Sequence, residues 1–121
     1  MEPKKILVVD DELDFVDAVK ARLEAMGYNI IAAHDGQECV AKARKELPSL
    51  ILLDIVMPKS NGFEALSRLK TDHLTANIPV IVITAKSDSE YILDAGKLGA
   101  ADYIMKPVSM HTLLDYVRKY A

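Results

Sequence analysis

The sequence has little of what would attach a chain to a membrane, a nucleic acid or a disulfide network. Cys39 is its single cysteine, so no internal disulfide can form, which favours a reducing cytoplasm. No apolar run is long enough to span a bilayer, and the four apolar residues after Lys5 are too few for the core of a signal peptide. The net charge of −3 argues against a nucleic-acid surface, so contact with DNA would need another domain or partner.

Apolar residues are plentiful enough to build a core. They make up 50% of the 121 residues, and the mean hydropathy of +0.09 is typical of a soluble globular protein. No repeat, low-complexity tract or linker divides the chain, so we expect residues 1–121 to form one domain. We expect Cys39 to serve packing. His34, His73 and His111 lack metal-ligand spacing and are expected to be solvated.

Five runs of residues predict β-strands. Four of them, at 6–9, 50–53, 80–83 and 103–105, are rich in aliphatic and β-branched residues and show no alternation. Such runs suit strands that are buried on both faces of a parallel sheet. The fifth run, at 28–33, is less apolar, and we expect it at an edge of the sheet.

Helical patterns separate the strands. The first pattern places apolar residues at three- and four-residue steps, at Leu13, Val16, Val19, Leu23 and Met26. Gly27 follows it as a stop. A capping box at 35–38 opens the second helix, and Pro48 ends it after Leu47. A third helix is expected from Phe63 to about residue 71.

The last two helices have recognisable caps. Residues 87–89 are N-cap candidates for a helix that carries Ile92, Ala95 and Leu98 and that Gly99 closes. Gly96 weakens this helix by up to ~1 kcal/mol relative to alanine, so we expect it to be the softest. The fifth helix is expected from its cap at Ser109 to about Tyr120, with Leu113, Leu114 and Val117 facing inward.

The count of five βα units predicts an α/β fold. Short loops and right-handed crossovers give a doubly wound, five-stranded parallel sheet with five helices distributed over both faces. The pattern alone does not fix the strand order. A central first strand beside the less apolar second strand favours the order 2-1-3-4-5. The stretch 56–62 has the composition of an irregular loop.

Each of the four apolar runs ends on a residue that can bind a phosphate or a metal. These residues are Asp10 with Asp11, Asp54, Thr84 and Lys106. Because parallel strands share one carboxyl edge, we expect the side chains to meet there. Three converging carboxylates repel one another unless a cation lies between them, and oxygen ligands of this kind suit Mg²⁺. A hydroxyl and an ammonium beside such a cluster are the groups that bind a phosphoryl group.

Taken singly, each residue also has a structural explanation. Asp10 and Asp11 could simply begin a helix, whose dipole favours acids at its start. Thr84 could end a strand, because threonine has good β propensity. Lys106 could be a solvated strand end. The constellation is therefore stronger evidence than its parts.

The strand ends belong to a longer set of short motifs. The set comprises Asp10-Asp11-Glu12, Asp54 with Met57-Pro58 and Gly62, Thr84-Ala85, Gly99-Ala100, Asp102-Tyr103 and Lys106-Pro107. In this order and at these spacings, over essentially the whole chain, it resembles the receiver domains of two-component response regulators, the CheY-like family. The resemblance implies a flavodoxin-like sheet of order 2-1-3-4-5.

The resemblance assigns roles to the carboxylates. Asp54 would be the phosphoacceptor, attacking a phosphohistidine of a histidine kinase or phosphotransfer protein to form an aspartyl phosphate. Asp11 and Asp54 would ligate Mg²⁺ directly. The backbone carbonyl of Val56 would be a third ligand, and Asp10 would act through water.

The resemblance also assigns roles to three other residues. Lys106 would pair with the phosphoryl oxygens, and the Lys106-Pro107 bond is expected to be cis. Thr84 would donate its hydroxyl to the phosphoryl group, and Tyr103 would turn inward as an aromatic switch. That motion would redraw the surface made by the fourth helix, the fifth strand and the fifth helix, which faces a downstream protein or output domain. The alternative for Tyr103 is an ordinary core aromatic packed under the last helix.

Positions that vary within the family modify this expectation. Val56 and Lys86 lie where the family tunes the lifetime of the phosphate. Val56 has no polar side-chain group to orient a hydrolytic water, which predicts slow self-dephosphorylation. Ala101 and Val108 replace an acid and a phenylalanine common in receivers that dimerise to bind DNA, which weakens the case for that mode of dimerisation.

Three other functions remain as alternatives. A Mg²⁺-dependent phosphohydrolase with Asp54 as nucleophile, similar to the haloacid dehalogenase family, would need an acid where Val56 stands. A flavin or nucleotide binder would need Gly, Ser or Thr in the acidic loop at 10–14. A receiver that no longer accepts phosphate is the third alternative. The intact set of Asp11, Asp54, Thr84 and Lys106 speaks against it.

Overall fold

The computed structural model describes residues 2–57, 60–85 and 89–121. The strands are β1 (Lys5–Val9), β2 (Asn29–Ala33), β3 (Leu50–Leu53), β4 (Val56–Met57), β5 (Ser60–Asn61), β6 (Val80–Thr84) and β7 (Asp102–Met105). The helices are α1 (Leu13–Ala25), α2 (Gly36–Glu46), α3 (Gly62–Thr71), α4 (Ser89–Lys97) and α5 (Met110–Tyr120). No helix in the described part of the chain is both long and apolar enough to cross a membrane.

The main sheet has five parallel strands in the order β2-β1-β3-β6-β7, which confirms the predicted topology. β2 lies at one edge, as its weaker apolar character predicts. Val9 pairs with Leu53, so β1 and β3 end together at the carboxyl edge. Leu53 pairs with Val82, and β6 continues beside β7 to Thr84. The residues that follow in the chain therefore emerge side by side.

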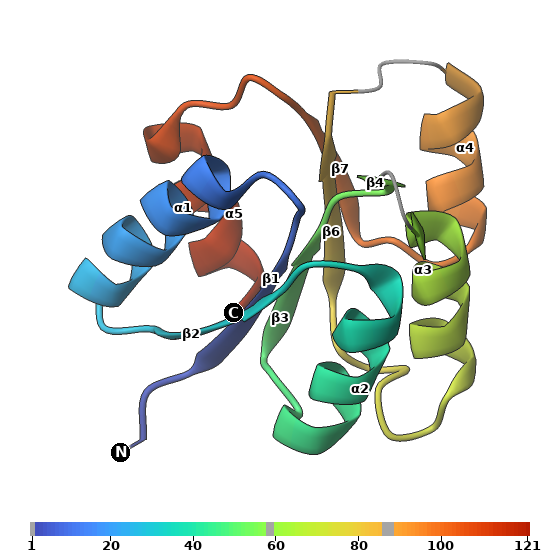
Figure 1. Cartoon of the computed structure of the whole chain (residues 1–121), viewed down its shortest axis with the longest axis horizontal. Coiled ribbons are helices and arrows are strands. Elements are labelled where there is room, and N and C mark those ends of the chain that lie inside the picture. Colours follow the sequence, from blue (N-terminus) through green and yellow to red (C-terminus); the bar gives the residue numbers. More distant parts are fainter. Residues whose placement is uncertain (1, 58–59, 86–88) are drawn as a thin grey trace.

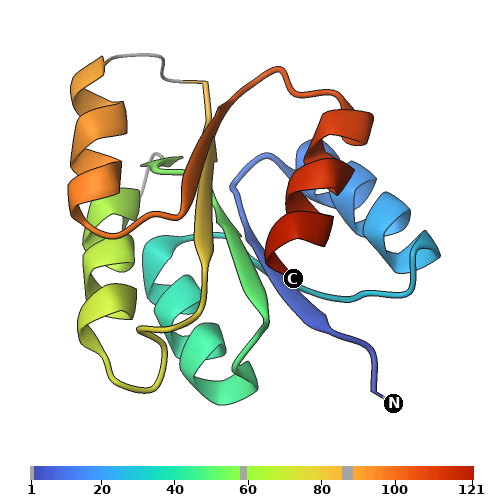
Figure 2. The same ribbon diagram turned by 180° about the vertical axis from the view of Figure 1, so that it is seen from behind.

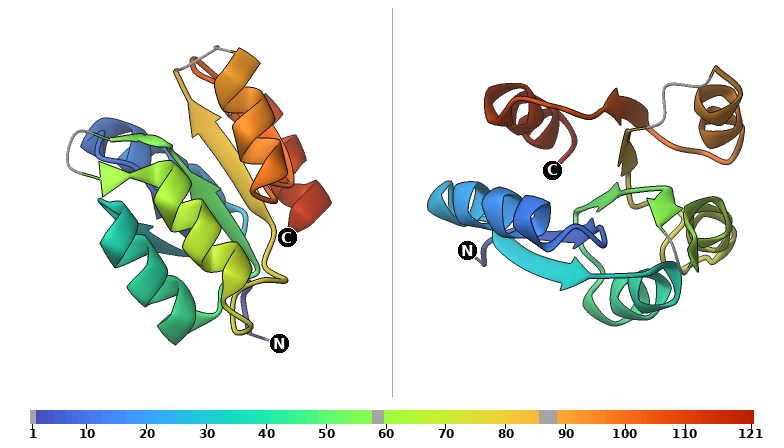
Figure 3. Two further views of the ribbon diagram at one scale, coloured as in Figure 1. Left: turned by 90° about the vertical axis from the view of Figure 1, so that its right-hand side faces the viewer. Right: turned by 45° about the horizontal axis from the view of Figure 1, so that its top comes forward.

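Helices cover both faces of this sheet. α1 and α5 lie on one face, and α2, α3 and α4 lie on the other (Figures 1 and 2). The views along other directions show the same two layers with the sheet between them (Figure 3). Strand side chains alternate between two buried clusters, one under each helical layer, which is why the strands read as continuous apolar runs.

The predicted caps are largely confirmed. The Asp35 side chain accepts a hydrogen bond from the amide of Glu38 at 2.7 Å, and Ser109 accepts one from Thr112 at 3.1 Å. The capping box is only half formed, because the Glu38 carboxylate accepts from the amide of His34. Gly27 closes α1 with a φ of 95°.

Fewer apolar helix residues are buried than the periodicity predicts. Leu13 and Met26 are exposed at the two ends of α1, beyond the reach of the sheet. Leu47 is not a buried helix residue but a left-handed C-cap of α2 with a φ of 47°, and it is also exposed. Ile92 on α4 is exposed, which leaves Ala95 as the buried residue of that helix.

The described residues after Asp54 differ from the prediction. β4 and β5 form a two-stranded antiparallel sheet where an irregular loop was expected, and Gly62 already begins α3. A Cβ on Gly62 would lie 2.3 Å from the Cα of Ile55, so only glycine allows this close backbone contact. The cap candidates Ser87 and Asp88 lie outside the described residues.

Candidate functional site

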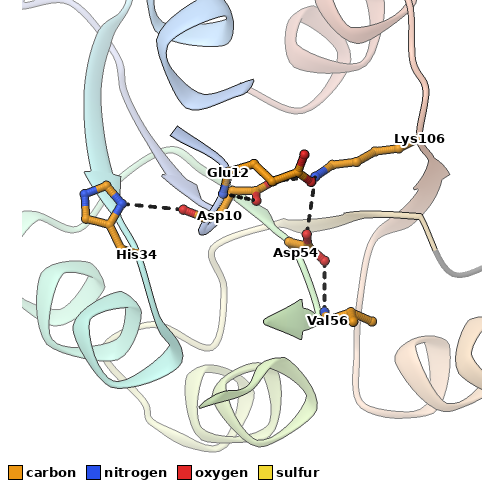
Figure 4. Close-up of polar contacts among 6 residues, drawn as sticks. All are labelled: Asp10, Glu12, His34, Asp54, Val56 and Lys106. Carbon is orange, nitrogen blue, oxygen red and sulfur yellow. Dashed lines mark hydrogen bonds and ion pairs between the residues drawn. The ribbon is translucent and has the colours of Figure 1, made fainter. Parts of the chain in front are cut away.

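Three of the predicted side chains meet at the carboxyl edge of the sheet (Figure 4). The Nζ atom of Lys106 lies 2.7 Å from Oδ2 of Asp10 and 3.3 Å from Oδ2 of Asp54. The backbone sets these positions, since the amide of Asp54 donates to the carbonyl of Val9 at 2.9 Å and the amide of Lys106 to that of Thr84 at 2.9 Å. The convergence of β1, β3 and β7 residues is thus a direct consequence of strand register.

The site includes two residues to which the sequence assigned no role. Oε1 of Glu12 lies 2.7 Å from Nζ of Lys106, although the side chain of Glu12 is 63% exposed. The ring of Phe15 lies under the same ammonium, with its centroid 4.4 Å from Nζ. Glu12 and Phe15 are three residues apart at the start of α1, so their side chains lie on the same side of this helix. The sequence could not show that Lys106 lies on that side.

The cluster is buried and charged. Asp10 is 1% exposed, Asp54 is 5% exposed, and the side chain of Lys106 is 11% exposed. Burial raises the pKa of Asp10, although its hydrogen bonds from Lys106 and from the amide of Glu12 oppose that shift. Burial would lower the pKa of Lys106, but its hydrogen bonds to Asp10 and Glu12 hold that pKa above the usual value. The ammonium therefore stays protonated and cannot act as a general base.

The donor set fits a hard divalent cation. Asp10, Glu12 and Asp54 each offer a carboxylate oxygen, and these oxygens lie within 4.8 Å of one another. One ammonium cannot neutralise three carboxylates, so the cluster attracts a further positive charge. Asp11 does not belong to this group among the described residues and is exposed. Its part as a direct Mg²⁺ ligand stays a prediction.

Asp54 is oriented by the backbone that follows it. Its Oδ1 accepts a hydrogen bond from the amide of Val56 at 2.9 Å, while its Oδ2 faces Lys106 (Figure 4). Val56 itself is exposed and brings an aliphatic side chain to the rim of the site. Lys86, the other position expected to tune the lifetime of the phosphate, lies outside the described residues.

Thr84 lies at the same edge with an unsatisfied hydroxyl. The residue is 0% exposed, and its Oγ1 is the buried side-chain polar atom without a hydrogen-bond partner in the described part of the chain. An unpaired buried hydroxyl costs about 1–3 kcal/mol. The β propensity of threonine explains why it fits the strand but not why this cost is tolerated. A group that arrives at the edge could accept the hydrogen bond.

The remaining predicted residues lie outside the charged cluster. Tyr103 is partly buried and packs against the cluster under α2, α3 and α4, so the alternative that places it under the last helix is wrong. The Lys106-Pro107 bond is cis, as the resemblance implied. His34 is exposed as predicted, yet its Nδ1 lies 3.5 Å from the carbonyl oxygen of Asp10. His73 is exposed and solvated as expected.

A pocket of about 400 Å³ opens beside the ammonium of Lys106. It is lined by Glu12, Phe15, Ala85, Lys106, Pro107 and Val108. The loops that follow β1, β6 and β7 thus surround a space next to the carboxylates. Small groups can approach the charged cluster from this side.

Comparisons with known proteins point to one family. The profile of the response regulator receiver domain matches residues 6–118. Protein PilH of Pseudomonas aeruginosa is 42% identical over 113 residues, which cover 93% of each chain. The alkaline phosphatase synthesis transcriptional regulatory protein PhoP of Bacillus subtilis is 45% identical over 107 residues, or 88% of this chain and 43% of that protein. The chain therefore spans about half the length of the transcriptional regulators that it matches.

Solved structures resemble the fold closely. The chemotaxis protein CheY4 of Vibrio cholerae has a TM-score of 0.92 at 28% identity, covering 98% of this chain and 99% of that one. A CheY-like receiver domain protein from Methanospirillum hungatei has a TM-score of 0.91 at 33% identity, covering 97% and 92%. These likenesses extend over the whole sheet and all five helices.

Proposed function

This chain belongs to the family of response regulator receiver domains, and we propose that its Asp54 accepts a phosphoryl group from a phosphohistidine of a histidine kinase or phosphotransfer protein. In this reaction an oxygen of Asp54 forms a bond to phosphorus while the bond from phosphorus to the imidazole nitrogen breaks. The observation that carries the proposal is the contact of Lys106 with both Asp10 and Asp54, made from three separate strands.

The residues that the resemblance assigns to the site would have separate parts in the transfer. The ammonium of Lys106 would pair with the phosphoryl oxygens, and the Thr84 hydroxyl would donate to one of them. Mg²⁺, held by carboxylates from the set Asp10, Asp11 and Asp54 together with the Val56 carbonyl, would neutralise charge on the same oxygens. The surplus of negative charge supports a bound cation. The unpaired Oγ1 of Thr84 supports a phosphoryl group that this cation would hold at the same edge.

The alternatives fit the site less well. A phosphohydrolase would need a proton-transferring side chain two residues after Asp54, where Val56 stands. A flavin or nucleotide phosphate would meet Asp10 and Glu12 rather than a cradle of backbone amides. A receiver that no longer accepts phosphate has no reason to keep Thr84 buried without a partner.

We further propose that phosphorylation is read at the surface formed by α4, β7 and α5. Thr84 would move toward the phosphoryl group, and Tyr103 on β7 would fill the space that it leaves. Such a switch shifts an existing equilibrium by about 1–3 kcal/mol. A downstream protein or output domain would bind this surface, and the domain itself would not bind DNA. The buried, unpaired Cys39 is compatible with a cytoplasmic setting for the exchange.

Mass measurement after incubation with a small phosphodonor and Mg²⁺ tests the phosphoacceptor role. The protein should gain one phosphoryl group, and the Asp54→Ala and Asp54→Asn variants should gain none. A chelator should abolish the gain in the unsubstituted protein. A phosphoryl group that persists in both variants would place the acceptor elsewhere, and no gain at all would reject the proposal.

A further inference from the structure

Lys106 also contacts an aromatic ring, and the proposed transfer assigns no role to this contact. Its Nζ lies over the face of Phe15, 4.4 Å from the ring centroid. Attraction between an ammonium and the negative face of a ring is stronger when water is excluded, and the side chain of Lys106 is only 11% exposed. The contact joins the first turn of α1 to the end of β7, and so it fixes the ammonium between two elements far apart in the chain.

We infer that Phe15 is a positioning residue whose ring holds the ammonium of Lys106 beside Asp54 during phosphoryl transfer, an inference that rests on the proposed function. Lys106 needs such a support because its contacts compete. Its Nζ is 2.7 Å from the exposed Glu12 carboxylate but 3.3 Å from the acceptor Asp54. A flexible four-carbon stem does not by itself favour the acceptor.

The pocket beside Lys106 leaves room into which the ammonium could move if the ring were absent. Phe15, Pro107 and Val108 form walls of that space of about 400 Å³, next to the ammonium. Without the aromatic wall, the ammonium could move into the pocket or follow Glu12 toward solvent. Transfer depends on a cation already in place when charge develops on the phosphoryl oxygens. Loss of the ring should therefore slow transfer without changing the carboxylates.

Plain packing is the competing explanation for Phe15. Its ring is partly buried and touches the cluster under α1 and α5. Packing depends on shape and area, whereas attraction to a cation depends on the electron density of the ring face. The two explanations therefore separate when the ring is made electron-poor at nearly constant shape.

The test replaces Phe15 site-specifically by a series of increasingly fluorinated phenylalanines, together with Phe15→Tyr and Phe15→Leu. The maximal rate constant of phosphorylation by a small phosphodonor should fall stepwise with fluorination. The fully fluorinated ring and Phe15→Leu should reach a loss of about five- to tenfold. Phe15→Tyr should keep the rate. The KM for the donor and the Kd for Mg²⁺ should change less than about twofold.

A matched control and a second readout complete the experiment. Tyr28→Leu removes another partly buried ring from the same cluster, next to the start of β2, and should leave the rate unchanged. In the unphosphorylated protein, the Cε protons of Lys106 should show a ring-current shift that Phe15→Leu abolishes. A phosphorylated wild type with a flat fluorination series, or no ring-current shift, overturns the role of Phe15 alone. A wild type that takes up no phosphoryl group overturns the proposed function as well.

Discussion

The interior and the carboxyl ends of strands β1, β3 and β6 have opposite effects on stability. Inside the sheet, residues such as Leu53 and Val82 are fully buried and apolar, and each removes hydrophobic surface from water at a gain of about 1.5–3 kcal/mol. One or two positions further along, Asp10, Asp54 and Thr84 are equally buried. These residues carry charge or an unpaired hydroxyl, which burial disfavours.

The difference shows how a small domain can tolerate buried charged residues at the carboxyl edge of its sheet. Burial raises the pKa of Asp10, which is the signature of a carboxylate kept from water at a cost in free energy. Lys106 offsets part of this cost by its short contact with Asp10. The apolar interior must supply the rest, so residues that stabilise the fold and residues that serve the site lie next to each other on the same strands.

Leu53→Ala should give the largest loss of stability, because it removes apolar surface from the interior of the sheet. Leu53 is 0% exposed and directly precedes Asp54. Truncation leaves a cavity under the central strands, and the free energy of unfolding should fall by about 2–5 kcal/mol in urea denaturation. The neighbouring Asp54→Asn, which changes charge but hardly volume, should cost less than about 1 kcal/mol. Equal losses from the two variants would show that the edge is no less stabilising than the interior.

Thr84→Val should act in the opposite direction. The methyl group replaces a hydroxyl that has no hydrogen-bond partner among residues 2–57, 60–85 and 89–121, so the free energy of unfolding should rise by about 1–2 kcal/mol. The same variant should lose the phosphorylation-dependent change at the surface of α4, β7 and α5, followed by amide chemical shifts. Thr84→Ser, which keeps the hydroxyl, is the matched control for signalling. A Thr84→Val or Thr84→Ala protein that still switches would contradict the proposed coupling.

Mg²⁺ should stabilise the folded protein through the acidic cluster. At ten times its Kd, an ion that binds only the folded state adds about 1.4 kcal/mol to the free energy of unfolding, visible as a rise in Tm. Asp54→Asn should remove most of this rise, since it deletes one carboxylate from the cluster. Substituting Asp11 and Glu12 separately shows which of the two is the ligand. If only Glu12→Gln weakens the effect, the predicted role of Asp11 is wrong.

Much of this edge could be predicted because it follows from local patterns and one topological rule. Apolar runs that end on Asp10, Asp54 and Lys106, placed on parallel strands, must bring those residues together. The strand order followed from the weak apolar character of 28–33 and from the resemblance to receivers. Local cap signals at Asp35 and Ser109 were equally reliable, because capping involves residues close in sequence.

Other features depend on distances that a sequence does not contain. The contacts of Glu12 and Phe15 with Lys106 join residues more than ninety positions apart, and they depend on side-chain directions as well as on the fold. The exposure of Leu13 follows from where the sheet ends, which the helical period cannot show. The β4–β5 pair arises where the backbone after Asp54 meets Gly62, a contact made only in the folded chain.

Val56→Asn should have the smallest effect on free energy, and it concerns only the chemistry at the edge. Val56 stands exposed beside Asp54 and offers no hydrogen bond to a water molecule that attacks the aspartyl phosphate. An amide side chain could orient such a water, so the phosphate should be lost several-fold faster, equivalent to about 1 kcal/mol of activation free energy. The measurement follows decay of the phosphorylated protein after the donor is removed, with Val56→Leu as the control for shape. Because the backbone amide of Val56 still holds Oδ1 of Asp54, stability should not change. A lifetime that is the same in both variants would mean that water reaches the phosphate without help from this position.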